Sequence, residues 1–355
     1  MNLLPSYWRL PTMRLSLRHL LCSAMLAAAP AVHAEPAGTA CSRACLAQTA
    51  DQVLASIVAH DPGAVPLARH YRATENGVPA ALAMMTIWRT ATRASDKFYV
   101  IDPETQNLFL LANIAEGTHQ ALLFGRIRLA DRKITEIEFY VDRSRSDGGF
   151  MFNPNGLAHL PAAWTQNVTP NRLPDRATLL RAGRSIFDTA IEGPPPAESC
   201  RMMENGGPVA EDAEVLKVIG GDAPQLPANP DGSVPIPCGA PPIRPTDPDA
   251  RTDIVDVQQG IVVSIGTMSG LVQPYLITHP TISAFVPTSL GQPYLDLLAA
   301  QHRTGRYETQ PELLPTPASI TVAQMHRYYD GKLQGMHLLE KLGPIGARSP
   351  WVAAR

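Results

Sequence analysis

Apolar positions recur at helical spacing in two parts of the chain. One run, from Leu46 to Val58, places its apolar residues on a single face, so we expect an amphipathic helix over residues 42–60. Asp61 as a helix cap followed by Pro62 predicts a short second helix. The other run, residues 179–191, predicts a helix that opens the second half of the chain.

Runs rich in β-branched and aromatic residues, bounded by turn residues, predict strands in both halves. In the first half these runs cover residues 97–101, 108–114, 119–129 and 134–143. In the second half they cover residues 253–257, 261–267, 320–329 and 333–341. Helices together with antiparallel strands in this arrangement indicate an α+β chain.

Three groups of residues occur in the same order in both halves, which predicts an internal repeat. Residues 74–77 match 203–206 at an offset of 129, and residues 100–114 match 254–266 at an offset of 154. Residues 127–141 match 325–340 at an offset of 199. The offset only grows along the chain, as expected if the second copy carries insertions. Chance similarity between hairpins is the alternative.

These patterns predict where the parts of the chain begin and end. We expect a signal peptide over 1–34, a first unit over 35–145, a connection over 146–175 and a second unit over 176–345, followed by a tail over 346–355. Residues 194–250 form an insertion that contains 13 of the 34 prolines, and we expect it to be an extended surface excursion.

The first residues have the features of a secretory signal. Arg14 and Arg18 precede an apolar run over 20–31, and Val32-His33-Ala34 supplies a small-residue cleavage site. The run is shorter than the roughly 20 residues that cross a bilayer, and no later run approaches that length. We therefore expect a periplasmic or secreted protein with no membrane partner.

Four cysteines remain after the signal: Cys41, Cys45, Cys200 and Cys238. An even number in an exported chain predicts two disulfides, and three pairings are open. A four-cysteine zinc site is the alternative, but the spacings lack the paired short loops of such sites.

Charge and motifs narrow the classes of function. A net charge of −2 with mixed signs gives no basic surface for nucleic acid or anionic lipid, so a small weakly charged partner fits better. The chain has no nucleophile elbow, phosphate-binding glycine loop or paired-histidine metal motif. We expect no cofactor and no metal.

Several short motifs resemble a known superfamily. They are Cys41-Ser42-Arg43-Ala44-Cys45-Leu46, His60-Asp61-Pro62, Thr74-Glu75-Asn76-Gly77, Trp88-Arg89-Thr90-Ala91 and Ile134-Thr135-Glu136-Ile137-Glu138. They are similar to exported fungal and bacterial proteins of the nuclear transport factor 2-like (SnoaL-like) superfamily. The resemblance implies two tandem cone-shaped units, each a curved antiparallel sheet packed on helices around an apolar pocket. It covers the first unit well and leaves residues 268–318 unplaced.

The resemblance also implies a class of activity. Enzymes of this superfamily typically carry out proton chemistry without cofactors, and some release formaldehyde from lignin-derived aromatic dimers. We therefore expect a cofactor-independent lyase or isomerase that uses general acid and base catalysis on a small apolar molecule, such as a lignin-derived aromatic. The alternatives are a non-catalytic periplasmic binding protein and a purely structural pair of units.

The last hairpin holds the candidate catalytic residues, since alternate residues of a strand face opposite sides. In this superfamily the pocket side corresponds to Gln334, Met336, Leu338 and Glu340, so Met336 is a candidate substrate contact and Glu340 a candidate base with a raised pKa. His337 would face a partner sheet, through which an oligomer could also form, and Tyr328 is a candidate oxyanion donor. Solvent exposure of Glu340 and structural roles for His337 and Tyr328 are the alternatives.

Residues near the expected cone mouths complete the candidate site. Arg72 is a candidate catalytic residue. Glu75, Arg201 and Glu204 are candidate substrate contacts, with ion pairs that stabilise turns as the alternative. Trp88 and Arg89 would supply an aromatic wall and a guanidinium, although a core position for Trp88 is the simpler interpretation.

Overall fold

Two mixed β-sheets and a few helices make up the part of the chain that the structure describes. The computed structural model describes residues 40–143, 151–211, 229–230, 233–239, 246–272, 285–288 and 316–352. Both sheets belong to one compact unit, Gly38–Arg355. The chain is therefore α+β, as the sequence predicts. The signal-peptide prediction lies outside the described residues.

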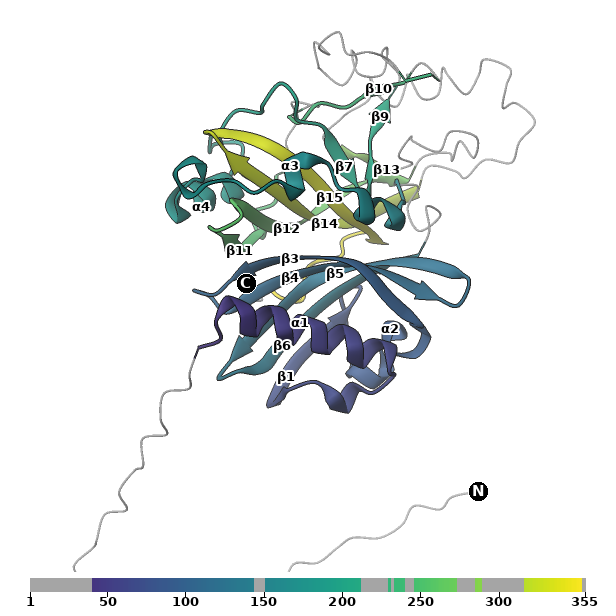
Figure 1. Cartoon of the computed structure of the whole chain (residues 1–355). Helices are drawn as coiled ribbons and strands as arrows, with labels where there is room; N and C mark the ends of the chain where they lie inside the picture. Colours follow the sequence, from purple (N-terminus) through teal and green to yellow (C-terminus); the bar gives the residue numbers. More distant parts are fainter. Residues whose placement is uncertain are drawn as a thin grey trace, which may run out of the picture. The chain divides into compact units, whose positions relative to one another are not determined.

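The first sheet has six strands in the order β2-β1-β6-β5-β4-β3. The strands are β1 (Leu67–Glu75), β2 (Val78–Pro79), β3 (Arg93–Asp102), β4 (Asn107–Glu116), β5 (His119–Ala130) and β6 (Lys133–Asp142). Helix α1 (Arg43–Val58) lies across one face, which we call the inner face of this sheet (Figure 1). Short helices at Pro62–Ala64, Leu82–Met84 and α2 (Thr86–Thr90) accompany it. The predicted helix after Asp61 is present as one turn, with the Asp61 carboxylate accepting from Gly63 N.

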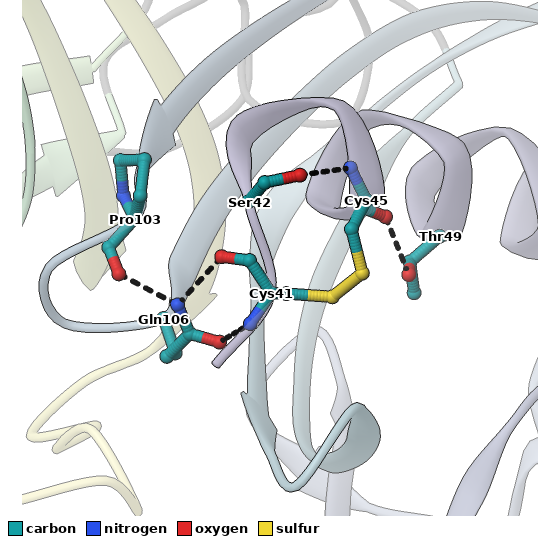
Figure 2. Close-up of a disulfide and its surroundings, with 6 residues drawn as sticks. All are labelled: Cys41, Ser42, Cys45, Thr49, Pro103 and Gln106. Carbon is teal, nitrogen blue, oxygen red and sulfur yellow. Dashed lines mark hydrogen bonds between the residues drawn. A yellow bond between two sulfur atoms is a disulfide. The ribbon is translucent and has the colours of Figure 1, made fainter. Parts of the chain in front are cut away.

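A disulfide secures the start of α1. Cys41 and Cys45 are bonded across the first helical turn, and the Ser42 hydroxyl accepts a hydrogen bond from Cys45 N as N-cap (Figure 2). The Gln106 side chain, in the β3–β4 turn, accepts from Cys41 N at 2.6 Å and donates to Cys41 O at 2.9 Å. The helix is thus tied to the sheet at its N-terminus. The other disulfide joins Cys200 and Cys238, which selects one of the three pairings that the sequence left open.

The inner face of the first sheet is a filled apolar core. Leu46, Val53 and Ile57 of α1 are fully buried in one cluster with Ile137, Phe139 and Val141 of β6. Apolar burial of this extent is the main source of stability in a domain. The predicted helical period of α1 is confirmed.

The second sheet contains seven strands, six of which follow the order β11-β12-β14-β15-β7-β8. They are β7 (Met202–Glu204), β8 (Gly207–Pro208), β11 (Arg251–Asp256), β12 (Ile261–Val272), β14 (Thr316–Tyr329) and β15 (Lys332–Pro344), while β13 (Phe285–Pro287) pairs with β12. Strands β9 (Ala210–Glu211) and β10 (Val234–Pro235) form a separate pair. The helical elements are Pro154–His159, α3 (Ala162–Thr165), Pro170–Arg172 and α4 (Arg176–Arg184).

The two sheets share one pairing register as well as one strand order. Strands β1 and β6 run parallel, as do β7 and β15. Each residue pair of the β5–β6 hairpin recurs 199 residues later in the β14–β15 hairpin. The register shift between Arg128 and Leu129 also recurs, between Arg327 and Tyr328. The turn pairing of Thr74 with Pro79 likewise recurs between Met203 and Pro208. Positions related by the offsets of 129, 154 and 199 residues are therefore structurally equivalent.

Two expectations about the second half need correction. The helix expected over 179–191 ends at Arg184, because Ile186 and Phe187 are buried outside a helix and Phe187 packs over Gly266. The described residues of the proline-rich segment 194–250 include packed structure, and residues 212–228, 231–232 and 240–245 of this prediction lie outside the described residues. Its strand β7 belongs to the second sheet, and Val209, Val234 and Ile236 are buried. Prolines 208 and 235 lie in very short strands, where a missing amide disturbs little of the ladder.

The outer faces of the two sheets pack against each other. Phe109, Phe124 and Tyr140 of the first sheet share one buried cluster with Ile254, Val263 and Leu339 of the second. The face expected to meet a partner sheet thus meets one within the same chain.

Reciprocal polar contacts border this interface. Arg43, the first residue of α1, forms two hydrogen bonds of 2.8 and 2.7 Å with Asp256, which also accepts from Ile101 N. Arg176, the first residue of α4, forms two bonds of 2.9 Å with Asp102, which also accepts from Val255 N. Each half therefore uses equivalent groups to hold the other.

Candidate functional site

The inner faces of the two sheets differ in chemistry at equivalent positions. In the first sheet four of these positions are Gly125, Ile127, Leu129 and Val141, and three of them belong to the apolar core under α1. In the second sheet the same positions hold Gln324, His326, Tyr328 and Glu340, all of which are buried. Burial of polar groups opposes folding unless they are hydrogen-bonded, so this replacement indicates a role other than stability.

A hydrogen-bonded row runs along β14. The Tyr328 hydroxyl lies 3.1 Å from His326 Nδ1, and His326 Nε2 lies 3.2 Å from Gln324 Oε1. Burial lowers the pKa of His326 to about 3 and raises the pKa of Tyr328, so both groups are neutral over the physiological range. The Gln324 oxygen as acceptor places the imidazole proton on Nε2 and leaves Nδ1 to accept from Tyr328.

Two carboxyl groups lie on the next two strands of the sheet, Glu340 on β15 and Glu204 on β7. Glu340 on β15 is 5 % exposed, and burial together with the charges of Glu204 and Asp142 raises its pKa well above the usual value. Glu204 on β7 pairs with Leu338 in the register and accepts a 2.6 Å hydrogen bond from Met151 N. Because like charges in one buried site do not both ionise readily, Glu340 retains its proton where an isolated carboxyl would lose it.

Asn205 fixes the geometry around Glu340. Its Oδ1 accepts from Glu340 N at 2.8 Å, and its own N–H donates to Leu338 O at 2.9 Å. The equivalent Asn76 makes the same two contacts in the first sheet, with Val141 N and Phe139 O. The turn that holds the carboxyl strand is thus part of the shared framework, whereas the side chain at position 340 differs from its counterpart Val141.

His337 lies on the opposite face of β15 from Glu340. Its Nε2 accepts from Gly206 N at 3.0 Å, its ring centre lies 6.1 Å from that of Trp164, and burial lowers its pKa to about 3. These contacts give it a structural role at the turn after β7. The structure therefore places His337 and Glu340 on different sides of the sheet.

A crevice of about 380 Å³ opens at the outer-face edge of β7 and β15. Its walls include Trp164, Met202, Met203 and Gly335, with Arg201 and His159 among the polar groups; we call it the Arg201 crevice. Gly335 is required there, because a Cβ would lie 2.8 Å from the Trp164 ring. The volume matches that of small-molecule sites.

The remaining predicted site residues lie in the first unit, away from the residues described above, or have structural roles. Glu75 accepts from Thr86 N and Ile87 N, so it caps α2, and Trp88 is a core residue that donates to the Ser56 hydroxyl at 3.0 Å. Arg89 is exposed on α2, and the Arg72 guanidinium lies 4.4 Å from the centre of the Trp351 ring. Met336 packs against the apolar cluster beneath α4.

The structure thus brings together only some of the predicted residues. Glu340, Glu204 and Tyr328 share the inner face of the second sheet with Met336, whereas Arg72, Trp88 and Arg89 are not part of this group. Gln324, His326 and Trp164 were not predicted as site residues. The signal that could have found Gln324 and His326 is a polar residue in the second half at a position where the first half has a glycine or an apolar residue.

Comparisons with other proteins do not identify the chain. No protein-family model matches it, and no curated protein matches it. Within the described ranges, no group of three or more His, Cys, Asp or Glu side chains is placed to hold a metal ion. A search of the described helices finds none that is long and apolar enough to cross a membrane.

Proposed function

We propose that the second unit is a cofactor-independent acid–base catalyst, a lyase or isomerase, that acts on a small apolar molecule at the inner face of its sheet. One observation carries the proposal: four positions of a shared framework hold Gln324, His326, Tyr328 and Glu340 in this sheet, where the first sheet has glycine and apolar residues. The resemblance to nuclear transport factor 2-like proteins supports the same class of chemistry. The two disulfides support an exported protein.

Glu204 and Glu340 together provide a proton acceptor and a proton donor. In an isomerisation, the Glu204 carboxylate accepts a proton from a carbon next to a carbonyl group, and the protonated Glu340 returns a proton at a second carbon. A carboxyl with a raised pKa is suited to this role because its proton is available near neutral pH. Neither step requires a cofactor.

The Tyr328 hydroxyl supplies a donor for the developing oxyanion. With the Gln324 amide rotated and the imidazole proton on Nδ1, His326 donates to the phenol oxygen, and the phenol proton is directed to a substrate oxygen. A neutral histidine can adopt either tautomer, and its low pKa keeps it neutral. Donors placed at such a site contribute strongly to catalysis.

Deuterium exchange tests the proposal. The purified protein is incubated in D₂O with a panel of small ketones and plant-derived aromatics, with NMR detection of exchange and assay of released aldehydes. We expect turnover of at least one compound, and a rate about 10²-fold lower for Glu340→Gln. Glu136→Gln, on the last strand of the first sheet, should keep the wild-type rate. A Glu340→Gln variant with unchanged turnover would refute the assignment.

The Arg201 crevice supports a second candidate, a binding protein without catalytic activity. A crevice with apolar walls and a few polar groups is sufficient for binding. The same panel separates the two, because a compound that shifts NMR signals of the protein but undergoes no exchange, cleavage or isomerisation supports binding alone.

A further inference from the structure

The C-terminal tail occupies one edge of the first sheet. The Trp351 ring lies 4.4 Å from the Arg72 guanidinium and 5.0 Å from that of Arg126, and its Nε1 donates to Thr74 Oγ1 at 3.0 Å. Arg72 and Thr74 are alternate residues of β1, so both face the same side of the strand. The tail thus places an indole on a cationic, outward-facing site at the edge of the sheet.

The Arg201 crevice occupies the equivalent place in the second sheet. Arg72 and Thr74 correspond to Arg201 and Met203 at the offset of 129 residues, and both of these residues line the crevice. The neighbouring position on the last strand is Glu136 in the first sheet and Gly335 in the second. Where the first sheet is covered by an aromatic side chain of the tail, the second has an open volume of about 380 Å³.

We propose that the Arg201 crevice binds a compact aromatic molecule whose ring stacks on the Arg201 guanidinium, as the Trp351 indole stacks on Arg72. Arg201 Nη1 donates to Glu198 O at 2.6 Å and to Cys200 O at 2.9 Å, and these two bonds restrain the guanidinium of this lining residue. The Cys200–Cys238 disulfide secures the strand end that carries it. A fixed guanidinium offers its face to a ring, and arginine is a frequent partner in such contacts.

The remaining walls suit the same ligand. Met203 lines the crevice from the outer face of β7, and methionine sulfur makes favourable contacts with aromatic rings. Trp164 adds an aromatic wall. In the first sheet the Thr74 hydroxyl accepts a hydrogen bond from the indole N–H of Trp351. Met203 stands at the equivalent position and has no hydroxyl, so a ligand of the crevice needs no N–H group there. Phenols therefore fit the site as well as indoles. This inference does not depend on the acid–base proposal, since the crevice is on the outer-face edge and Glu340 faces inward.

Calorimetric titration tests the site, with indole, phenol and cyclohexanol as probes. Phenol and cyclohexanol share size and hydroxyl group and differ in aromaticity. We expect indole to bind with a stoichiometry of one and phenol to bind more tightly than cyclohexanol. Arg201→Met, which keeps the apolar stem, should weaken indole binding by about threefold to tenfold. Arg128→Met, an exposed change on the first sheet, should leave it unchanged.

A second variant tests the equivalence on which the inference rests. Trp351→Ala uncovers Arg72, so we expect the stoichiometry of indole to rise from one to two, and Trp351→Ala combined with Arg72→Met to return it to one. Equal affinities for phenol and cyclohexanol, no effect of Arg201→Met, or no indole binding to the wild-type chain would each overturn the proposal. So would a folded Trp351→Ala variant that still binds one indole. Proton exchange in the Arg201→Met variant reports on the acid–base proposal separately.

Discussion

The first and second sheets have the same strand order and register, yet their inner faces have opposite characters. The first is covered by the 16-residue α1 and filled with apolar side chains. The second is associated with the 9-residue α4 and contains Gln324, His326 and Glu340 at positions where the first has no polar side chain. One backbone framework thus serves for stability in one half and accommodates ionisable groups in the other.

The contrast shows where the cost of burying polar groups can be offset. Desolvation of groups such as Glu340 and His326 opposes folding, as their shifted pKa values indicate. The second sheet is held against the first by a shared apolar cluster and by the reciprocal contacts of Asp102 and Asp256. The filled half therefore supports the half that carries the candidate site.

The largest expected effect comes from breaking a reciprocal contact. Asp256→Ala removes a side chain with no solvent exposure and leaves Arg43 and the Ile101 amide without their acceptor. We expect the free energy of unfolding to fall by about 3–5 kcal/mol, measured by urea denaturation. Asp102→Ala should have a similar effect, because it removes the equivalent contacts.

A surface ion pair serves as the control for that comparison. Asp51 pairs with Lys97, and about half of each side chain is exposed, so Asp51→Ala should cost less than about 1 kcal/mol. Strongly unequal effects of Asp256→Ala and Asp102→Ala would show that the two contacts are not energetically equivalent.

A smaller effect should follow from altering the glycine that distinguishes the two sheet edges. In Gly335→Ala the new Cβ would overlap the Trp164 ring, and we expect a loss of about 1–3 kcal/mol from overpacking. Gly343→Ala, on the same strand, should be nearly neutral, because its Cβ would meet no atom closer than 3.7 Å. Equal unfolding midpoints for the two variants would contradict the tight contact.

The last expected effect is a pH dependence of the free energy of unfolding, which comes from the two buried histidines of the second half. Its size per pH unit is the smallest of the effects described. His326 and His337 have pKa values of about 3, against roughly 6.5 in an unfolded chain. The unfolded state therefore takes up protons first, and the free energy of unfolding falls as the pH drops from about 6.5 towards 3. Each histidine should contribute up to about 1.4 kcal/mol per pH unit.

Urea denaturation at several pH values measures this slope. Glu340, with its raised pKa, makes stability fall as the pH rises above about 4.5, so the series is best run in a Glu340→Gln background. His337→Gln should remove about half of the acid-side slope. A slope that does not change with this substitution would assign the acid sensitivity to other groups.

Much of the fold could be predicted from periodicity. All eight predicted strands are present, and the offsets between the halves agree with the observed register. Glu340 and His337 lie on opposite faces of β15, as the alternation along this strand predicts. The length of α4 was wrong, because apolar periodicity records burial and cannot distinguish a helix from the buried coil around Phe187.

The candidate site was less predictable than the fold. Asp256 was recognised as part of the repeat, but its partner Arg43 is 213 residues away and no local pattern links the two. The same holds for Trp351, whose contacts with Arg72 and Thr74 join the two ends of the described chain. Such contacts depend on how the two sheets pack, and local patterns do not report packing between distant segments.

The exchange of Arg43–Asp256 and Arg176–Asp102 contacts resembles the self-complementary interface of two identical subunits, but here one polypeptide carries both partners. Because the halves are tethered, their association does not depend on protein concentration, and dilution cannot separate them. A substitution also falls on one half only, whereas a gene for identical subunits would place it in both. Tethering of this kind permits one half to carry polar residues at its inner face while the other half keeps an apolar core.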